Sequence, residues 1–291
     1  MNLIVTATKE TFESLIKKDI QGIILPVKNH AMRFSDDFTV EEIIDLVPAI
    51  QAHDKKAYVA LNAIYHEDQL EALKKTVKKL SKLPIDGLYF ADLAVFEYAL
   101  ECGLNDFLIY YPETYVTNYQ DMAFWQQENI KSAVLSREMT LEDIEKIALN
   151  STLDVSIIGH GYLNMFHSKR RLIKTFLDYT KKNNLPQNHK QTYKIIEEIR
   201  DEAYPIYQDQ FGTHIFREKP LSSIQVFDVL SRYVEYFIID TQFYSQQQIL
   251  KIIDDYCALK NGMSIDEAYY SDHDDGFYHK KTVYKQGGGG K

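Results

Sequence analysis

The feature that most constrains the fold is a regular alternation of short β-branched apolar runs with amphipathic helical segments. In segment 41–47, for example, apolar pairs recur at helical spacing. The runs that we expect to form strands are 3–7, 22–26, 57–62, 87–92, 107–111, 132–136, 153–158 and 236–240. Eight strands joined by helices predict a (β/α)8 TIM-type barrel, with a doubly wound open sheet as the alternative.

Two predicted helices carry start signals. Thr39 is followed three residues later by Glu42, and Thr140 is followed at the same spacing by Asp143. A hydroxyl followed by an acid at this spacing is typical of a capping box, or of a variant with Asp in the acidic position. We therefore expect helices to begin directly after Thr39 and Thr140.

A long connection interrupts the alternation between the seventh and eighth runs. It holds about 75 residues, whereas connections of about 4–6 residues are usual. Runs 192–198 and 213–217 within it read as strands of a small hairpin unit with a turn at 208–212. We predict one barrel domain over 1–285, with a β-rich insertion at 162–232 that builds or covers the site. The Gly-rich tail, 286–291, is expected to be disordered.

Composition and charge exclude several classes of protein. The net charge of -9 argues against a generally basic nucleic-acid surface, although it allows a local basic patch. Cys102 and Cys257 form no C-x-x-C pair, so neither a disulfide framework nor a thiolate metal site is predicted. Segment 1–7 is too short for a signal peptide, and no apolar run reaches the roughly 18 residues that a membrane span needs. We expect a cytoplasmic protein with no membrane partner.

Charged residues follow the sixth and seventh predicted strands, at the positions where barrel proteins place their sites. The guanidinium of Arg137 can bind a carboxylate or phosphate through two parallel hydrogen bonds, or form a structural ion pair at the strand end. His160 can act as a general acid or base, or serve as a structural donor. Arg137, Glu138 and His160 are our candidate catalytic residues. Gly161 is a candidate ligand-binding residue, because glycine lets a ligand approach the backbone.

Polar residues also lie at or just after the third, fourth and fifth predicted strands. A barrel gathers its strand ends into one ring, so we expect these side chains to line the mouth and bind a ligand. Residues of these types are also common in turns and caps, which is the competing interpretation. The four residues are Asn62, Asp92, Thr114 and Asn118.

A basic cluster follows the seventh predicted strand. Lys169, Arg170 and Arg171 are candidate nucleic-acid-binding residues, because aromatic residues nearby in sequence can stack a base while the cations contact phosphates. A solvated charge run is the alternative. His167 lacks the spacing of a zinc site, so no metal is predicted.

Several blocks, in order, resemble peptidase family U-32, the collagenase-like group, over residues 3 to about 285. The most specific is Leu135-Ser136-Arg137-Glu138-Met139-Thr140-Leu141-Glu142-Asp143-Ile144, which is similar to the family's L-x-R-E-L-S-L-E-E-I segment. Further matching blocks are 56–62, 86–92, 117–118 and 200–213. Locally, Glu113 follows Tyr110-Tyr111-Pro112 where related proteins often read Ser-Thr-Gln.

The family signature is incomplete in this chain. It continues from His-Gly to a Cys three residues later and then to Ser-Gly-x-Cys, but Asn164 and Arg171 hold these two cysteine positions. A second cysteine pair, expected before Tyr193, is also absent. The resemblance implies that members with the cysteines hold an iron–sulfur cluster, which requires thiolates. It implies that this chain binds no cofactor through cysteines.

The resemblance implies two functions. One is prephenate-dependent 5-hydroxylation of the wobble uridine of transfer RNA, in which the cysteine-free form resembles the shorter of two paired proteins. We expect this function, with transfer RNA and a cluster-bearing paralogue as partners and prephenate as the small substrate. The other is a collagenase-like peptidase of unknown catalytic type, although no G-x-S-x-G or H-E-x-x-H motif occurs. A third alternative is a non-catalytic binding subunit.

Overall fold

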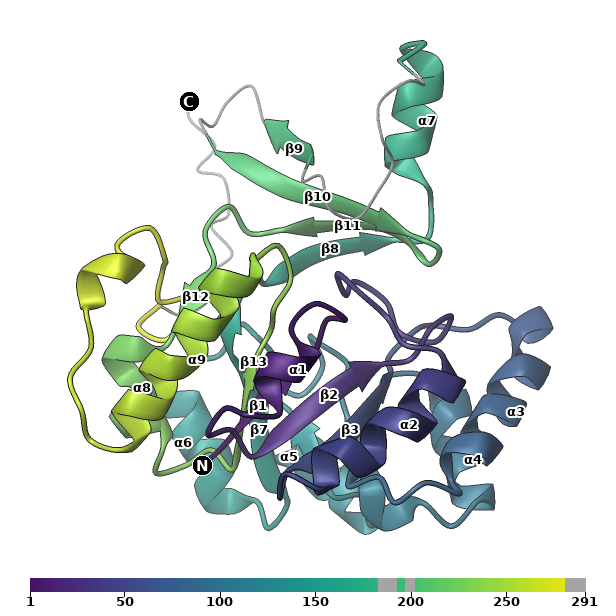
Figure 1. Ribbon diagram of the computed structural model, residues 1–291, viewed down its shortest axis with the longest axis horizontal. Helices are drawn as coiled ribbons and strands as arrows, with labels where there is room; N and C mark the ends of the chain where they lie inside the picture. Colours follow the sequence, from purple (N-terminus) through teal and green to yellow (C-terminus); the bar gives the residue numbers. More distant parts are fainter. Residues whose placement is uncertain (183–192, 197–201, 281–291) are drawn as a thin grey trace, which may run out of the picture.

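The computed structural model describes residues 1–182, 193–196 and 202–280. Eight parallel strands form a closed barrel in it (Figure 1). Strand β13 pairs with both β1 and β7, and β7 also pairs with β6, so the barrel sheet closes on itself. This confirms the predicted (β/α)8 barrel and excludes the doubly wound open sheet. The barrel strands are β1 (Asn2–Thr6), β2 (Gly22–Pro26), β3 (Lys56–Leu61), β4 (Gly87–Phe90), β5 (Leu108–Tyr110), β6 (Ser132–Val134), β7 (Asp154–Gly161) and β13 (Tyr236–Ile239).

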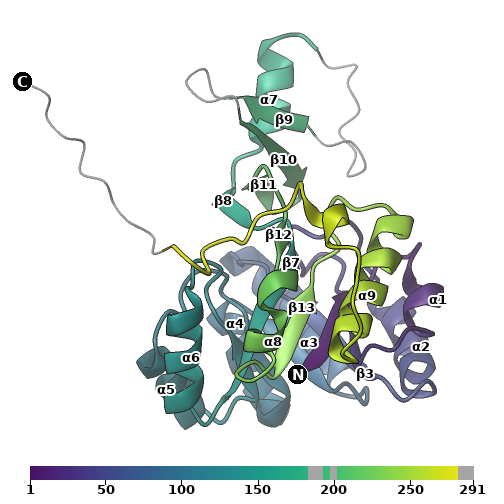
Figure 2. The same ribbon diagram turned by 90° about the vertical axis from the view of Figure 1, so that its left-hand side faces the viewer.

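Helices surround the barrel, as Figure 2 shows from the side. Helix α2 begins after Thr39, whose Oγ1 accepts from the backbone N–H of Glu42 at 3.1 Å. Helix α6 begins after Thr140, which accepts from the N–H of Asp143 at 3.1 Å. Both predicted starts are confirmed. The helices of this layer are α1 (Phe12–Leu15), α2 (Val40–Gln51), α3 (Leu70–Leu80), α4 (Leu93–Glu101), α5 (Tyr119–Gln127), α6 (Leu141–Asn150), α8 (Phe227–Leu230) and α9 (Gln246–Lys260), with 3-10 turns η1 (Glu67–Gln69), η2 (Asn105–Phe107), η3 (Ile224–Val226) and η4 (Glu267–Tyr270).

The barrel interior is filled by aromatic side chains. The rings of Tyr58 and Tyr89 meet edge to face with centroids 5.8 Å apart. The ring of Tyr236 also meets the ring of Tyr58 edge to face. Gly22 and Gly87 make room for the ring of Tyr58, because a Cβ at either glycine would lie within 2.7 Å of it. With its interior occupied, the barrel leaves only its mouth for a site.

A second sheet covers the mouth at the carboxyl ends of the barrel strands (Figure 1). It lies in the connection between β7 and β13, which confirms the predicted β-rich insertion. The predicted pairing of runs 192–198 and 213–217 was wrong, because β10 lies between them and pairs with both β9 and β11. The insertion holds β8 (Asn164–Ser168), α7 (Leu172–Tyr179), β9 (Tyr193–Ile196), β10 (Ala203–Asp209), β11 (Gly212–Phe216) and β12 (Leu221–Ser222). Tail 286–291 lies outside the described residues.

Candidate functional site

A fully buried arginine, Arg33, occupies the barrel mouth. It follows β2, and its guanidinium reaches residues from the ends of two other strands. Its Nε donates to Glu113 beyond β5, its Nη1 donates to Asp240 beyond β13 at 2.9 Å, and its Nη2 donates to the hydroxyl of Tyr111. Arg33 and Glu113 both have left-handed backbone, with φ of 64° and 68°. Such backbone is costly for non-glycine residues and is often retained at functional sites.

Glu113 extends this cluster toward the end of β6. Its second carboxylate oxygen accepts from Arg137 Nη2 at 2.8 Å and from Asn164 Nδ2 at 3.0 Å. Burial, together with the nearby charge of Arg33, lowers the pKa of Arg137 to about 10, so its guanidinium stays charged at neutral pH. The ion pair that the sequence suggested for Arg137 therefore exists, and its partner, Glu113, follows β5.

Asp209 connects the small sheet to the same cluster. Its Oδ2 accepts from the backbone N–H of Arg33 at 2.8 Å and lies 3.1 Å from His214 Nε2. Burial opposes ionisation of Asp209, but the hydrogen bond to His214 and those from backbone N–H groups hold the pKa of its carboxyl below the ordinary value. The ring of His167 stacks on His214 with centroids 4.7 Å apart. The hydrogen bond from the backbone of Arg33 to Asp209 thus joins the small sheet to the loop after β2.

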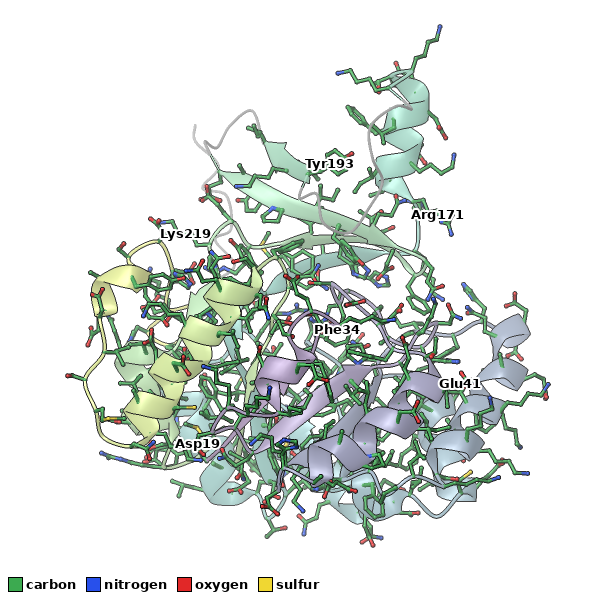
Figure 3. The ribbon with its side chains drawn as sticks, in the orientation of Figure 1. Asp19, Phe34, Glu41, Arg171, Tyr193 and Lys219 are labelled. Carbon is green, nitrogen blue, oxygen red and sulfur yellow. The ribbon has the colours of Figure 1, made fainter. Side chains whose placement is uncertain are left out.

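A cavity of about 400 Å³ adjoins this cluster, between the ends of β6 and β7, the small sheet and the C-terminal segment. Two buried atoms of lining residues have no hydrogen-bond partner within the described part of the chain, Arg217 Nη1 and Asn164 Oδ1. The other terminal nitrogen of Arg217 donates to Asp274 at 2.7 Å. Figure 3 labels Lys219, another lining residue, where the small sheet meets the barrel. A ligand here would have to offer one acceptor and one donor. The lining residues are Arg137, Glu138, Leu163, Asn164, Met165, Glu202, Tyr204, Arg217, Glu218, Lys219, Asp274 and Phe277.

Arg137 and Glu138 thus lie together at this cavity, but the four predicted mouth residues do not line it. Asn62 is fully buried and accepts from the backbone N–H of Met32 at 3.1 Å. Asp92 caps α4 and Asn118 caps α5 through their side-chain oxygens, and Thr114 is exposed. Their ligand-binding role stays a prediction, and the capping alternative describes two of them.

His160 lies apart from the cavity, enclosed in the protein. Its ring nitrogens lie 3.1 Å from the hydroxyls of Tyr256 and Tyr244. Burial, and to a lesser degree His273, lower the pKa of its imidazole well below the ordinary value, so the ring is neutral. The geometry favours a structural donor and acceptor, while the catalytic role stays a prediction.

Gly161 ends β7 with φ of 128°, and a Cβ there would lie 2.8 Å from the carbonyl oxygen of Asp240. The close approach that this glycine permits is therefore between two protein backbones. Its predicted ligand-binding role is not tested by this contact.

The three predicted nucleic-acid-binding residues, Lys169, Arg170 and Arg171, are exposed between β8 and α7. Figure 3 labels Arg171 at the base of α7. This basic cluster belongs to a different surface from the cavity, since none of the three residues lines it. Its role in binding nucleic acid stays a prediction.

The donor groups do not fit an iron–sulfur cluster. An amide and a guanidinium occupy the two family cysteine positions, at Asn164 and Arg171, and neither is a cluster ligand. The two cysteines lie on other elements, Cys102 at the end of α4 and Cys257 on α9, and both are partly buried. Within residues 1–182, 193–196 and 202–280, no three His, Cys, Asp or Glu side chains are grouped to hold a metal ion.

Sequence reasoning missed the centre of the cluster. Asp240 is the last residue of the eighth predicted strand, so the strand-end rule applied to charged residues would have found it. Arg33 and Asp209 lie in a loop and at a hairpin turn, and the sequence offers no signal that pairs them. His214 reads only as one position of a predicted strand.

The fold and the site define a (β/α)8 barrel protein whose mouth is covered by an inserted sheet and whose polar cavity lies between the two. The family model described as peptidase family U32 matches residues 7–280, and the chain belongs to this family. None of the helices in the described part of the chain is long and apolar enough to cross a membrane.

Two relatives come from Bacillus subtilis (strain 168). The chain is 28% identical to tRNA hydroxylation protein P2, over 93% of this chain and 94% of that protein. It is 20% identical to tRNA hydroxylation protein P1, over 82% of this chain but only 59% of that longer protein. The solved structure of the U32 peptidase Mk0906 covers 82% of this chain and 92% of its own, with a TM-score of 0.52 at 14% identity. That likeness supports the fold alone.

Proposed function

We propose that this protein acts in the 5-hydroxylation of the wobble uridine of transfer RNA, in the cytoplasm. The observation that carries the proposal is the similarity to tRNA hydroxylation protein P2, which extends over 93% of this chain and 94% of that protein. A match of this extent cannot be confined to the barrel, so it reaches into the insertion between β7 and β13.

The small substrate that we propose for the cavity is prephenate. Its two carboxylates suit the cations of Arg137, Arg217 and Lys219, and a carboxylate oxygen can accept from the unpaired Arg217 Nη1. Its hydroxyl can donate to the unpaired Asn164 Oδ1. The volume of about 400 Å³ is within the range of small-molecule sites. Carboxylates in the same wall, such as Glu218, can also accept a hydrogen bond from that hydroxyl.

Titration calorimetry with prephenate tests this assignment. Arg217→Met should weaken binding about tenfold or more, because a hydrogen bond to a charged group contributes about 1.5–3 kcal/mol. Arg232→Met, at an exposed arginine that does not line the cavity, is the matched control and should bind like the wild type. Equal affinity of both variants for prephenate would show that prephenate does not bind in this cavity.

The partner that we propose is a cluster-bearing family member. Two related proteins, P1 and P2, occur in one organism, and this chain is similar to both. Asn164 and Arg171 stand where the cluster ligands are expected, so any step that needs the cluster would have to come from the partner. Affinity purification of tagged protein from its own cells should recover such a relative, identified by its cysteine signature.

The peptidase alternative receives no support from the described geometry. Both ring nitrogens of His160 are engaged by tyrosine hydroxyls. The hydroxyl of Ser136 accepts from the backbone N–H of Glu138 at 3.4 Å, and that of Ser168 accepts from the N–H of Arg170 at 3.3 Å. Among the described residues, neither serine hydroxyl is hydrogen-bonded to this histidine, so neither has it as its base.

Nucleoside mass spectrometry of transfer RNA tests the proposed function. Deletion of the gene and of any redundant relative should remove 5-hydroxyuridine, and the wild-type gene should restore it. Arg217→Met should fail to restore it, whereas the control Arg232→Met should succeed. Unchanged hydroxyuridine in the deletion strain would refute the proposal.

A further inference from the structure

Helix α7 carries two apolar stripes although it docks through only one. One stripe is Ile173, which is partly buried, and Leu177, four residues on, which is only 2% exposed. Leu172, Phe176 and Tyr179 recur at helical spacing on another side and are 37%, 60% and 87% exposed. One stripe is enough to dock a helix of this length, so the exposed rings are not explained by folding.

The helix is held firmly at its base. The backbone N–H of Leu172 donates to Thr213 Oγ1 at 3.0 Å, and that hydroxyl donates to the carbonyl of Arg170 at 2.7 Å. The N–H of Lys174 donates to Gln208 Oε1 at 3.2 Å. The exposed rings are therefore presented by an anchored element that projects from the small sheet (Figures 1 and 2).

Positive charge gathers around these rings. Segment 169–182 has six basic residues and one acidic residue, a net charge of +5 in a chain of net charge -9. The acidic residue, Asp178, is paired with Lys174 at 2.7 Å. The first helical turn contains no acidic residue, and cations at this end oppose the helix dipole, so helix stability does not explain them. The basic residues, all exposed, are Lys169, Arg170, Arg171, Lys174, Lys181 and Lys182.

We propose that α7 and its basic flanks bind an unpaired stretch of RNA. The cations contact phosphates, while Phe176 and Tyr179 stack on unpaired bases, the combination by which proteins hold single-stranded nucleic acid. The inference deepens the proposed function, on which it rests, by naming the element that receives the RNA. An anionic membrane fits less well, since binding to a bilayer surface scales with the apolar area buried and α7 has only about two turns to offer. RNA accounts for both the rings and the charges.

Fluorescence anisotropy with a labelled anticodon stem–loop tests this surface on the full-length protein. The double variant F176A/Y179A should weaken binding at least about tenfold, since each stacked base contributes about 1–3 kcal/mol. Phe124→Ala, on α5 and 55% exposed in the wild type, is the matched control and should leave affinity unchanged. R170A/R171A should make the dependence of log affinity on log salt less steep by about 1.4, because each phosphate contact in a single strand contributes about 0.7 to the steepness.

Equal affinity of F176A/Y179A and the wild type would overturn the assignment. The assignment would also be overturned if the wild-type protein did not bind the stem–loop but bound anionic vesicles, or associated with itself, through these rings. The failure of the two proposals can be told apart. Loss of hydroxyuridine on gene deletion with unaltered RNA binding by the variants refutes only the α7 surface. Weakened RNA binding by the variants with hydroxyuridine intact in the deletion strain refutes only the hydroxylation role.

Discussion

Replacing Arg33 with methionine should strongly destabilise the protein. The change removes the only cation that pairs with Asp240 among the described residues, at 2.9 Å, while Glu113 keeps Arg137 and Asn164. Removal of one partner from a buried ion pair costs about 3–5 kcal/mol, because the other charge stays buried without compensation. The left-handed backbone strain is the same in both proteins and cancels. For a domain of this size the loss corresponds to a fall in Tm of roughly 6–20 °C.

Urea unfolding at neutral pH, followed by circular dichroism, measures this loss. Lys79→Met is the matched control, because Lys79 pairs with Glu41 at 3.0 Å on an exposed surface, where an ion pair contributes below about 1 kcal/mol. In a double-mutant cycle with Asp240→Asn, the coupling free energy should reach about 0.5–3 kcal/mol. Arg33→Lys should fall between the wild type and Arg33→Met, since an ammonium keeps the charge but cannot reach all three partners.

A loss no larger than that of Lys79→Met would refute the reasoning. Such a result would mean that water reaches the carboxylate of Asp240 once the arginine is gone. A coupling free energy near zero in the cycle would also refute it, since it would show that the two charges act independently.

Three further predictions concern single positions. Asp209→Asn should destabilise the protein at neutral pH by about 1–3 kcal/mol. Because the pKa of Asp209 is lowered on folding, its contribution is present above the ordinary value of 3.8 and lost as pH falls through the folded value, so urea unfolding from pH 7 to 3 should show the variant approaching the wild type. Gly161→Ala should lower Tm in differential scanning fluorimetry, since its φ of 128° costs about 1–3 kcal/mol and the added Cβ would meet Asp240. His160→Gln should restore hydroxyuridine in the deletion strain in proportion to folded protein on immunoblots, because the imidazole it replaces is buried and neutral; full-length, folded but inactive protein would instead support the catalytic role.

The barrel was predictable because its signals are local. Each strand is a short apolar run, and the caps at Thr39 and Thr140 each lie within four residues of chain. The hairpin was mispredicted because β10, with Ala203, Pro205 and Asp209 at intervals, lacks the alternation that marked its neighbours. Segment β10 is a strand because it pairs with β9 and β11, and not because its own sequence predicts a strand.

The site was predictable only where a strand end lay beside the residue. Arg137 and Glu138 were found this way, and both line the cavity. Arg33 was not, because its side-chain partners are separated from it by 78 residues or more and pair with it only when the barrel closes. His160 lies buried between two tyrosine hydroxyls, and the sequence gives no measure of how many hydroxyls will surround an imidazole.

The position of β13 in the chain also sets the order in which the protein can be completed during synthesis. β13 fills the place between β7 and β1, so a nascent chain that ends before it has an open barrel whose tyrosine-lined interior meets water. The bond from Arg33 to Asp240 joins residues 207 apart and forms only after this last strand has left the ribosome. Until then the chain exposes apolar surface that chaperones can bind and through which chains can aggregate. Slow emergence of the segment after β7 should therefore limit the yield of folded protein more than slow translation of any earlier strand.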